Sequence, residues 1–166
     1  MKRIQKEFIK FLEDPVSGFK IAQTLENDLY NWRLEMEGPK NTPYEGGIFY
    51  LEVYFSVDHP FKPFKASFIT QMYHVNIDSR GTFGLPMLHD NWSPVTTVSH
   101  LASTIVTLLE SPQPWYTNNP EACQLFETNH ALYEQTARKW TEQYAQKPIQ
   151  NKSIPKSPEK QVNPTS

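Results

Sequence analysis

The side chains that could perform chemistry in this chain are few. Its single cysteine, Cys123, stands in the segment PEACQLF, which has the pattern of a short helix, and no neighbouring group is evident that would activate the thiol. A lone cysteine on such a helix is most often a small buried apolar side chain. The five histidines have no spacing typical of a metal site. We therefore expect no metal site, no bound cofactor and no internal disulfide.

The longest segment without regular periodicity runs from residue 74 to residue 95. Residues that break regular structure punctuate it: Gly81, Gly84, Pro86 and Pro94. Irregular segments of this length are usually functional or mobile. Taken by itself, His74 at its start predicts a structural histidine bonded to backbone groups. The hydroxyl of Thr82 is a potential nucleophile, but no general base is evident near it.

The flanking sequence predicts the elements that must position this segment. Ile4, Phe8 and Phe11 share one face of an amphipathic helix over residues 2–13. Periodic apolar patterns predict three strands and then three helices, at residues 29–36, 49–55, 66–70, 98–109, 120–127 and 130–146. Strands in a run with most helices after them indicate an α+β domain.

Composition excludes several functional classes. Sixteen basic residues against eighteen acidic ones give a net charge of -2, which argues against a general nucleic-acid or membrane binder. The charged N-terminus lacks the apolar run of a signal peptide, and we expect a soluble protein of the cytoplasm or nucleus. Residues 147–166 contain no aromatic residue, and we expect them to form a disordered tail after a domain of residues 1–146.

Several segments, taken in their order along the chain, resemble the ubiquitin-conjugating enzymes. KRIQKEF is similar to the first helix of the D subfamily, MEGPKNTPYEGGIFYLEVYF to its sheet and HPFKPFKASF to its proline-rich turn. The resemblance covers residues 1–146 and implies the fold of that family. Such a fold has an N-terminal helix, a four-stranded antiparallel meander, a long irregular active-site loop and C-terminal helices.

The active-site segment matches this family in part. The family has the motif HPN, then a loop with the reactive cysteine, then a Trp-Ser-Pro turn. Here His74 and Asn76 match the motif, the turn begins at Trp92, and Gly84 stands at the position of the cysteine. The family passes ubiquitin through a thioester on that sulfur. Glycine offers no nucleophile, so the resemblance implies a catalytically inactive variant, a pseudoenzyme.

Other catalytic positions of the family have also changed. Val75 replaces the proline of HPN, and Pro86 replaces an acidic residue after the cysteine loop. Tyr116 aligns with the aspartate that helps to deprotonate the incoming lysine, and tyrosine cannot act as a carboxylate. Ser103 aligns with a leucine that packs against the linked ubiquitin. Asn76 steadies an oxyanion in the family, and here we expect it to serve hydrogen bonds within the loop.

The surface that RING-type ligases grip in this family is better retained. The matching residues are Arg3, Lys6, Phe61, Ser93 and Pro94. Taken alone, Phe61 would pack under its own turn, but the resemblance favours an exposed anchor. Arg3 and Lys6 fit a ligase contact and a solvated helix face equally well. The resemblance thus implies RING-type ligases, ubiquitin, or an active ubiquitin-conjugating enzyme as partners.

The sequence leaves three alternatives to an inactive binding module open. The protein is an active conjugating enzyme if Cys123, or a hydroxyl such as that of Thr82, accepts ubiquitin. It is a decayed duplicate if it folds but has no selected function. It acts as one subunit of a heterodimer if it binds an active conjugating enzyme. Trp115 and Tyr116 also remain open: they form a new contact surface, or they lie over the groove at Gly84.

Overall fold

One antiparallel sheet forms the centre of the structure, and its four strands follow one another in space as they do in the chain. The computed structural model describes residues 2–25 and 28–146. The elements are α1 (Lys2–Glu13), β1 (Phe19–Leu25), β2 (Asp28–Glu37), β3 (Ile48–Tyr54), β4 (Lys65–Phe68), α2 (Val98–Glu110), α3 (Pro120–Thr128) and α4 (His130–Tyr144), with short 3-10 helices at Pro86–Leu88 and Pro114–Tyr116. The predicted α+β class and order of elements are confirmed.

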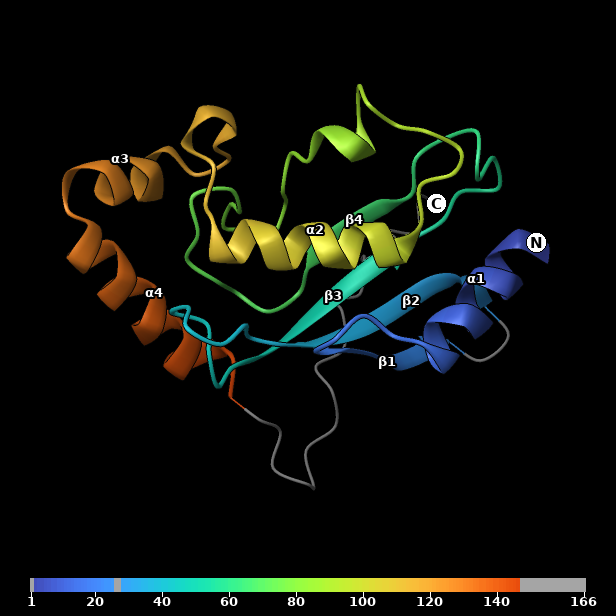
Figure 1. Ribbon diagram of the computed structural model, residues 1–166, viewed down its shortest axis with the longest axis horizontal. Helices are drawn as coiled ribbons and strands as arrows, with labels where there is room; N and C mark the ends of the chain where they lie inside the picture. Colours follow the sequence, from blue (N-terminus) through green and yellow to red (C-terminus); the bar gives the residue numbers. More distant parts are fainter. Residues whose placement is uncertain (1, 26–27, 147–166) are drawn as a thin grey trace, which may run out of the picture.

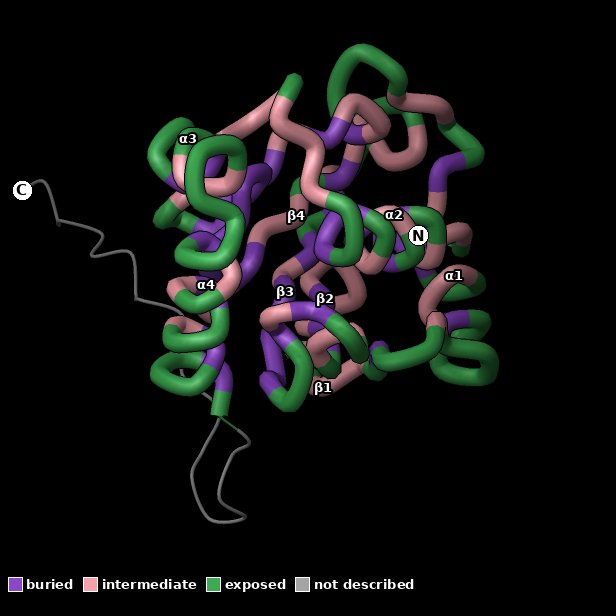
Figure 2. Tube along the Cα trace, turned by 60° about the vertical axis from the view of Figure 1, so that its left-hand side comes forward, coloured by how far each residue is buried: buried purple, intermediate pink, exposed green. Residues whose placement is uncertain are grey.

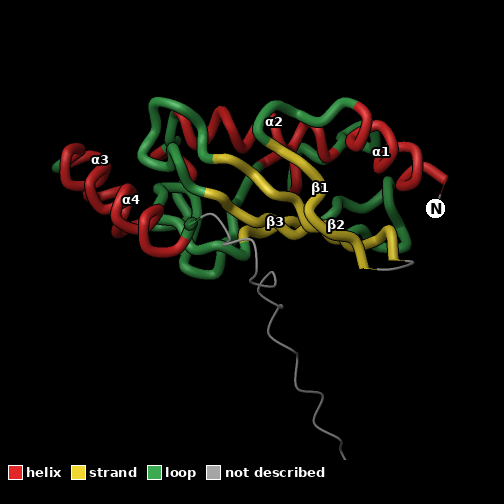
Figure 3. The backbone as a smooth tube through the Cα atoms, turned by 90° about the horizontal axis from the view of Figure 1, so that it is seen from below, coloured by secondary structure: helices red, strands yellow, loops and turns green. Residues whose placement is uncertain are grey.

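The two faces of the sheet differ in polarity because side chains alternate along each strand. On the inner face Leu34 of β2 stands opposite Leu51 of β3, and Met36 stands opposite Phe49. All four are fully buried. On the outer face charged residues pair across the strands, as Arg33 does with Glu52 at 2.9 Å. Seen from below, β1, β2 and β3 lie in front of α2 (Figure 3).

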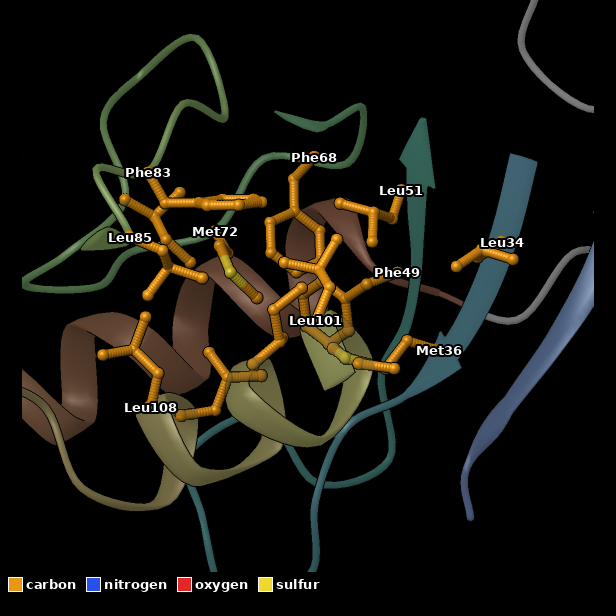
Figure 4. Packing of buried hydrophobic residues seen from close by; sticks show 14 of the residues in the cluster. Leu34, Met36, Phe49, Leu51, Phe68, Met72, Phe83, Leu85, Leu101 and Leu108 are labelled. Atoms are coloured by element: carbon orange, nitrogen blue, oxygen red, sulfur yellow. The ribbon is translucent and has the colours of Figure 1, made fainter. Parts of the chain in front are cut away.

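Helix α2 covers the inner face of the sheet. It lies across the strands, with α1 at one end of the molecule and α3 and α4 at the other (Figure 1). Leu101 of α2 points toward Phe49 and Phe68 of the sheet, whereas Leu108 points toward Leu85 of the irregular loop (Figure 4). The Thr97 hydroxyl accepts a hydrogen bond from the His100 backbone N–H and begins the helix. The outer turns of α4 are largely exposed (Figure 2).

Strand β1 is the element that periodicity alone did not mark. Its pairing with β2 shifts register between Ile21 and Gln23 and again between Thr24 and Leu25, so its side chains do not keep one alternation. The predicted disordered tail, residues 147–166, lies outside the described residues. Within the described ranges no helix combines the length and the apolar character needed to cross a membrane.

Candidate functional site

Gly84 lies in the irregular loop between two buried residues, Phe83 and Leu85. A Cβ atom built on Gly84 would lie 3.1 Å from the side-chain oxygen of Asn118, and its other close neighbours lie at 3.8 Å. The Asn118 amide nitrogen donates to the Thr82 carbonyl at 3.2 Å. The Asn118 side chain therefore stands beside the place where a side chain at position 84 would begin. A small shift of that flexible side chain makes room for one.

Gly81 holds this loop against the edge of the sheet. Its φ of +76° is one that L side chains rarely adopt, and a Cβ atom there would overlap the Phe68 carbonyl oxygen. The Phe68 backbone N–H donates to the Gly81 carbonyl at 2.9 Å. Gly81 is thus required by the backbone, whereas no left-handed φ requires a glycine at position 84.

His74 is a buried structural residue that joins the loop to α2. Its Nδ1 accepts the Asn76 backbone N–H at 2.9 Å, so the ring proton must reside on Nε2. Nε2 then donates to the Leu108 carbonyl at 3.0 Å. Burial lowers the pKa of His74 to about 4, although the bond to Leu108 acts in the opposite direction. At neutral pH the imidazole is uncharged and both nitrogens have partners.

The Asn76 side chain is committed to the backbone of the segment that follows α2. Its oxygen accepts the Gln113 N–H at 2.9 Å. Its amide group donates to the Gln113 carbonyl at 2.8 Å and to the Tyr116 carbonyl at 3.2 Å. Both amide hydrogens are therefore in use, and the side chain is 1% exposed. This arrangement fixes the loop and leaves no free donor for an oxyanion.

We expect Asn76→Ala to lower the free energy of unfolding by about 2 kcal/mol, because it removes three hydrogen bonds and leaves their backbone partners unsatisfied. Urea denaturation followed by tryptophan fluorescence measures the change. Asn91→Ala, at an exposed position, is the matched control and should stay within about 0.5 kcal/mol of wild type. A loss at Asn76 as small as that of the control would contradict the structural role.

The segment facing the loop carries two neighbouring aromatic residues, Trp115 and Tyr116. Trp115 is 76% exposed, and its indole N–H donates to the Gln113 side chain at 2.8 Å. The Tyr116 ring meets it edge to face at a centroid distance of 4.3 Å and packs against the core. Burial raises the pKa of Tyr116, so the phenol keeps its proton at neutral pH. Trp115 thus faces solvent, and neither residue supplies a base.

Cys123 and Thr82 have no contacts that would activate them as nucleophiles. Cys123 lies in α3 and is buried, and its sulfur is 3.8 Å from the Pro114 carbonyl oxygen. No described side chain hydrogen-bonds to the exposed Thr82 hydroxyl; the nearby Asp78 carboxylate accepts the Thr82 backbone N–H instead. Among the described residues no three His, Cys, Asp or Glu side chains gather as they would around a metal ion.

Five residues were predicted, from the family resemblance, to contact ligases. They lie on three segments, and we call this set the docking face: Arg3 and Lys6 on α1, Phe61 on the turn after β3, and Ser93 and Pro94 on the turn before α2. Phe61 is 82% exposed, so its ring does not pack under its own turn. Lys6 and Pro94 are also exposed, while Arg3 and Ser93 are half-buried.

Trp92 connects the turn that carries Phe61 to the turn that carries Ser93 and Pro94. The Trp92 indole N–H donates to the Pro60 carbonyl at 3.0 Å, and the Trp92 ring meets Phe64 edge to face at 5.4 Å. Sequence reasoning missed Val95, which follows Pro94 and is 72% exposed. An apolar residue in a polar turn was the available signal. The exposed surface of these turns is therefore more apolar than the matched residues alone indicate.

Comparison with known families agrees with the fold. The family model described as "Ubiquitin-conjugating enzyme" matches residues 3–141, which is most of the 166-residue chain. The matched range begins in α1 and ends within α4, so it includes the sheet, the loop with Gly84 and the docking face. The chain belongs to the ubiquitin-conjugating enzyme family.

Proposed function

We propose that this protein is a catalytically inactive ubiquitin-conjugating enzyme variant that binds RING-type ubiquitin ligases and competes with active conjugating enzymes for them. The observation that carries the proposal is the contrast between two parts of one molecule. Position 84 has no side chain to accept ubiquitin, whereas Phe61 stands out from the docking face with 82% of its surface free. The protein would occupy a ligase of the cytoplasm or nucleus without delivering ubiquitin to it.

The docking face has the features of a binding anchor. An exposed aromatic ring contributes large contact area with only two side-chain torsions to fix, and such residues dominate the free energy of binding at interfaces. Two hydrogen bonds hold the Phe61 turn rigidly. The Phe61 backbone N–H donates to the Asp58 carbonyl at 2.8 Å, and the Trp92 indole N–H donates to the Pro60 carbonyl. A rigid anchor loses little conformational entropy on binding.

We expect Phe61→Ala to weaken binding to a RING domain at least about tenfold, which is the effect of losing an interface anchor. The measurement is isothermal titration calorimetry against a panel of purified RING domains. Leu132→Ala, an exposed apolar residue on α4, is the matched control and should leave the affinity unchanged. Competition is measured separately, as slower ubiquitin discharge from an active conjugating enzyme when the protein is added.

Three results would contradict this proposal. Equal affinities for wild type and Phe61→Ala would show that the docking face is not the contact. If no RING domain in the panel binds, and no ubiquitin discharge is slowed, the protein is not a competitor for RING-type ligases. Charging of the wild type with ubiquitin would contradict the inactive assignment itself.

A further inference from the structure

One carboxylate, that of Glu7, lies where the three segments of the docking face meet. Glu7 stands on α1 beside Lys6, and its Oε1 accepts the Val98 backbone N–H at 2.6 Å. Val98 is the first residue of α2, four positions after Pro94. This bond joins α1 directly to the segment that carries Ser93 and Pro94. The bond is charge-assisted and lies at a helix N-terminus, where a carboxylate is favoured.

The second oxygen of Glu7 points to the third segment. Its Oε2 lies 3.8 Å from His59 Nε2, two residues before Phe61. The His59 side chain is completely buried and that of Glu7 is 9% exposed. Glu7 Oε2 and both His59 ring nitrogens have no hydrogen-bond partner among the described residues. Buried polar atoms without partners are rare in folded proteins, and here three occur together.

The surroundings of His59 leave Glu7 as its natural partner. The imidazole is enclosed by the rings of Phe55, Phe64 and Trp92, at centroid distances of 4.8, 6.3 and 6.2 Å. The Trp92 indole N–H is already engaged by Pro60. The distance from Nε2 to Oε2 exceeds that of a good hydrogen bond by about 1 Å. Small changes in the side-chain torsions of Glu7 and His59 would close it.

The charges facing this pair come from two helices. Burial raises the pKa of the Glu7 carboxyl, and the Val98 N–H and the charges of Arg3, His100 and Lys10 act in the opposite direction. Burial, together with the positive charge of Arg3, lowers the pKa of His59 to about 4. His59 is thus neutral at pH 7 and can donate one ring proton to the Glu7 carboxylate.

We propose that Glu7 and His59 are positioning residues of the docking face: the pair links the Phe61 turn to α1 and to the start of α2, so that a shift of one segment is transmitted to the others. The use of this link in ligase binding rests on the proposed function above, but the link itself is a property of the free protein.

The first test uses nitrogen-15-labelled free protein. Glu7→Gln keeps an oxygen for Val98 but presents an amide group to His59. We expect it to shift the His59 imidazole nitrogen signals and the Phe61 amide signal, although both lie on a different segment. Glu13→Gln, an exposed acid on the same helix, should shift neither. In a His59→Phe background, Glu7→Gln should no longer move the Phe61 signal.

The outcome that overturns the inference is a Glu7→Gln spectrum in which Val98 shifts but His59 and Phe61 do not. If Glu7→Gln fails to fold, a pH titration of the wild type decides instead. The Phe61 amide and the His59 nitrogens should then each show a transition at the midpoint of the Glu7 carboxyl, in addition to the transition at which His59 itself takes up a proton. The absence of a transition at the Glu7 midpoint would equally overturn the link.

The second test measures affinity for a RING domain that binds the wild type. Glu7→Gln and His59→Phe should each weaken binding about two- to tenfold, and the double variant should be no weaker than the single ones, as expected for coupled neighbours. Additive losses would refute the role of the pair in docking. If no RING domain binds the wild type, the proposed function fails, and the free-protein spectra alone decide whether the link exists.

Discussion

Replacing Gly84 by cysteine is expected to let the protein form a ubiquitin thioester that the wild type does not form. The backbone at position 84 accepts an L residue, and the nearest obstacle is the end of the flexible Asn118 side chain, 3.1 Å from the new Cβ atom. The measurement is incubation with ubiquitin-activating enzyme, ATP and labelled ubiquitin, followed by a non-reducing gel. A band that disappears under reducing conditions identifies the thioester.

A substitution at Asn118 should change the rate at which the Gly84→Cys variant is charged. Its amide nitrogen donates to the Thr82 carbonyl, which holds the side-chain oxygen toward position 84. We expect Gly84→Cys combined with Asn118→Ala to charge faster than Gly84→Cys alone, because the new sulfur then has free space on that side. Equal rates would show that Asn118 moves aside without resistance.

Two controls separate the possible acceptors in the wild type. If the wild type charges and Cys123→Ala abolishes the band, the protein is an enzyme with a relocated thiol, despite the burial of Cys123 in α3. If charging survives Cys123→Ala and resists reducing agent, an oxygen acceptor such as Thr82 is responsible. No charging in either protein, with charging in Gly84→Cys, shows that only the nucleophile is missing.

The elements with strong amphipathic patterns were predictable from the sequence, and those without them were not. Helix α1, strand β3 and helix α2 each present one apolar face to the same core, so their periodicity reports their burial. Strand β1 was not predicted from periodicity, because its register against β2 shifts twice and breaks the alternation of its side chains. Its presence followed only from the resemblance to the family.

Within the site, residue identity was readable but contacts were not. The hydrogen bonds of His74 to Leu108 and of Asn76 to Gln113 join residues more than thirty positions apart. No local pattern encodes such pairs, since they depend on how α2 crosses the sheet. The pair of Glu7 and His59 was missed for the same reason. A polar ring within the aromatic sequence around Phe55 and Phe64 was its only signal.

The protein should lose stability in acid: its free energy of unfolding should fall steadily as the pH drops from about 6.5 to about 4. Burial lowers the pKa of His74 to about 4 in the folded protein, whereas the ordinary value is 6.5. The unfolded chain therefore takes up this proton first, and stability that is complete above pH 6.5 is lost on the way down. The shift corresponds to at most about 3 kcal/mol for one histidine.

Two other groups modify the profile. His59, whose pKa burial likewise lowers to about 4, adds a loss of the same sign over the same range. Glu7 acts oppositely, because its raised pKa lets the folded protein take up a proton before the unfolded chain does. Stability gained from Glu7 therefore grows as the pH falls toward 4.5. We expect the two histidines to dominate, since their two losses oppose a single gain.

Urea denaturation at pH 7, 6, 5 and 4.5 measures this profile, and His74→Gln assigns it. Glutamine offers an oxygen and an amide group in place of Nδ1 and Nε2 but has no charge to gain. The variant should be less stable than wild type at pH 7 and lose less stability on acidification, so that the two curves converge near pH 4.5. His89→Gln, at an exposed position, should follow the wild type throughout. If His74→Gln retained the full wild-type dependence of stability on pH, the assignment of His74 as a buried neutral residue bonded to Asn76 and Leu108 would be wrong. The conclusion that His74 anchors the loop to α2 would then fail as well.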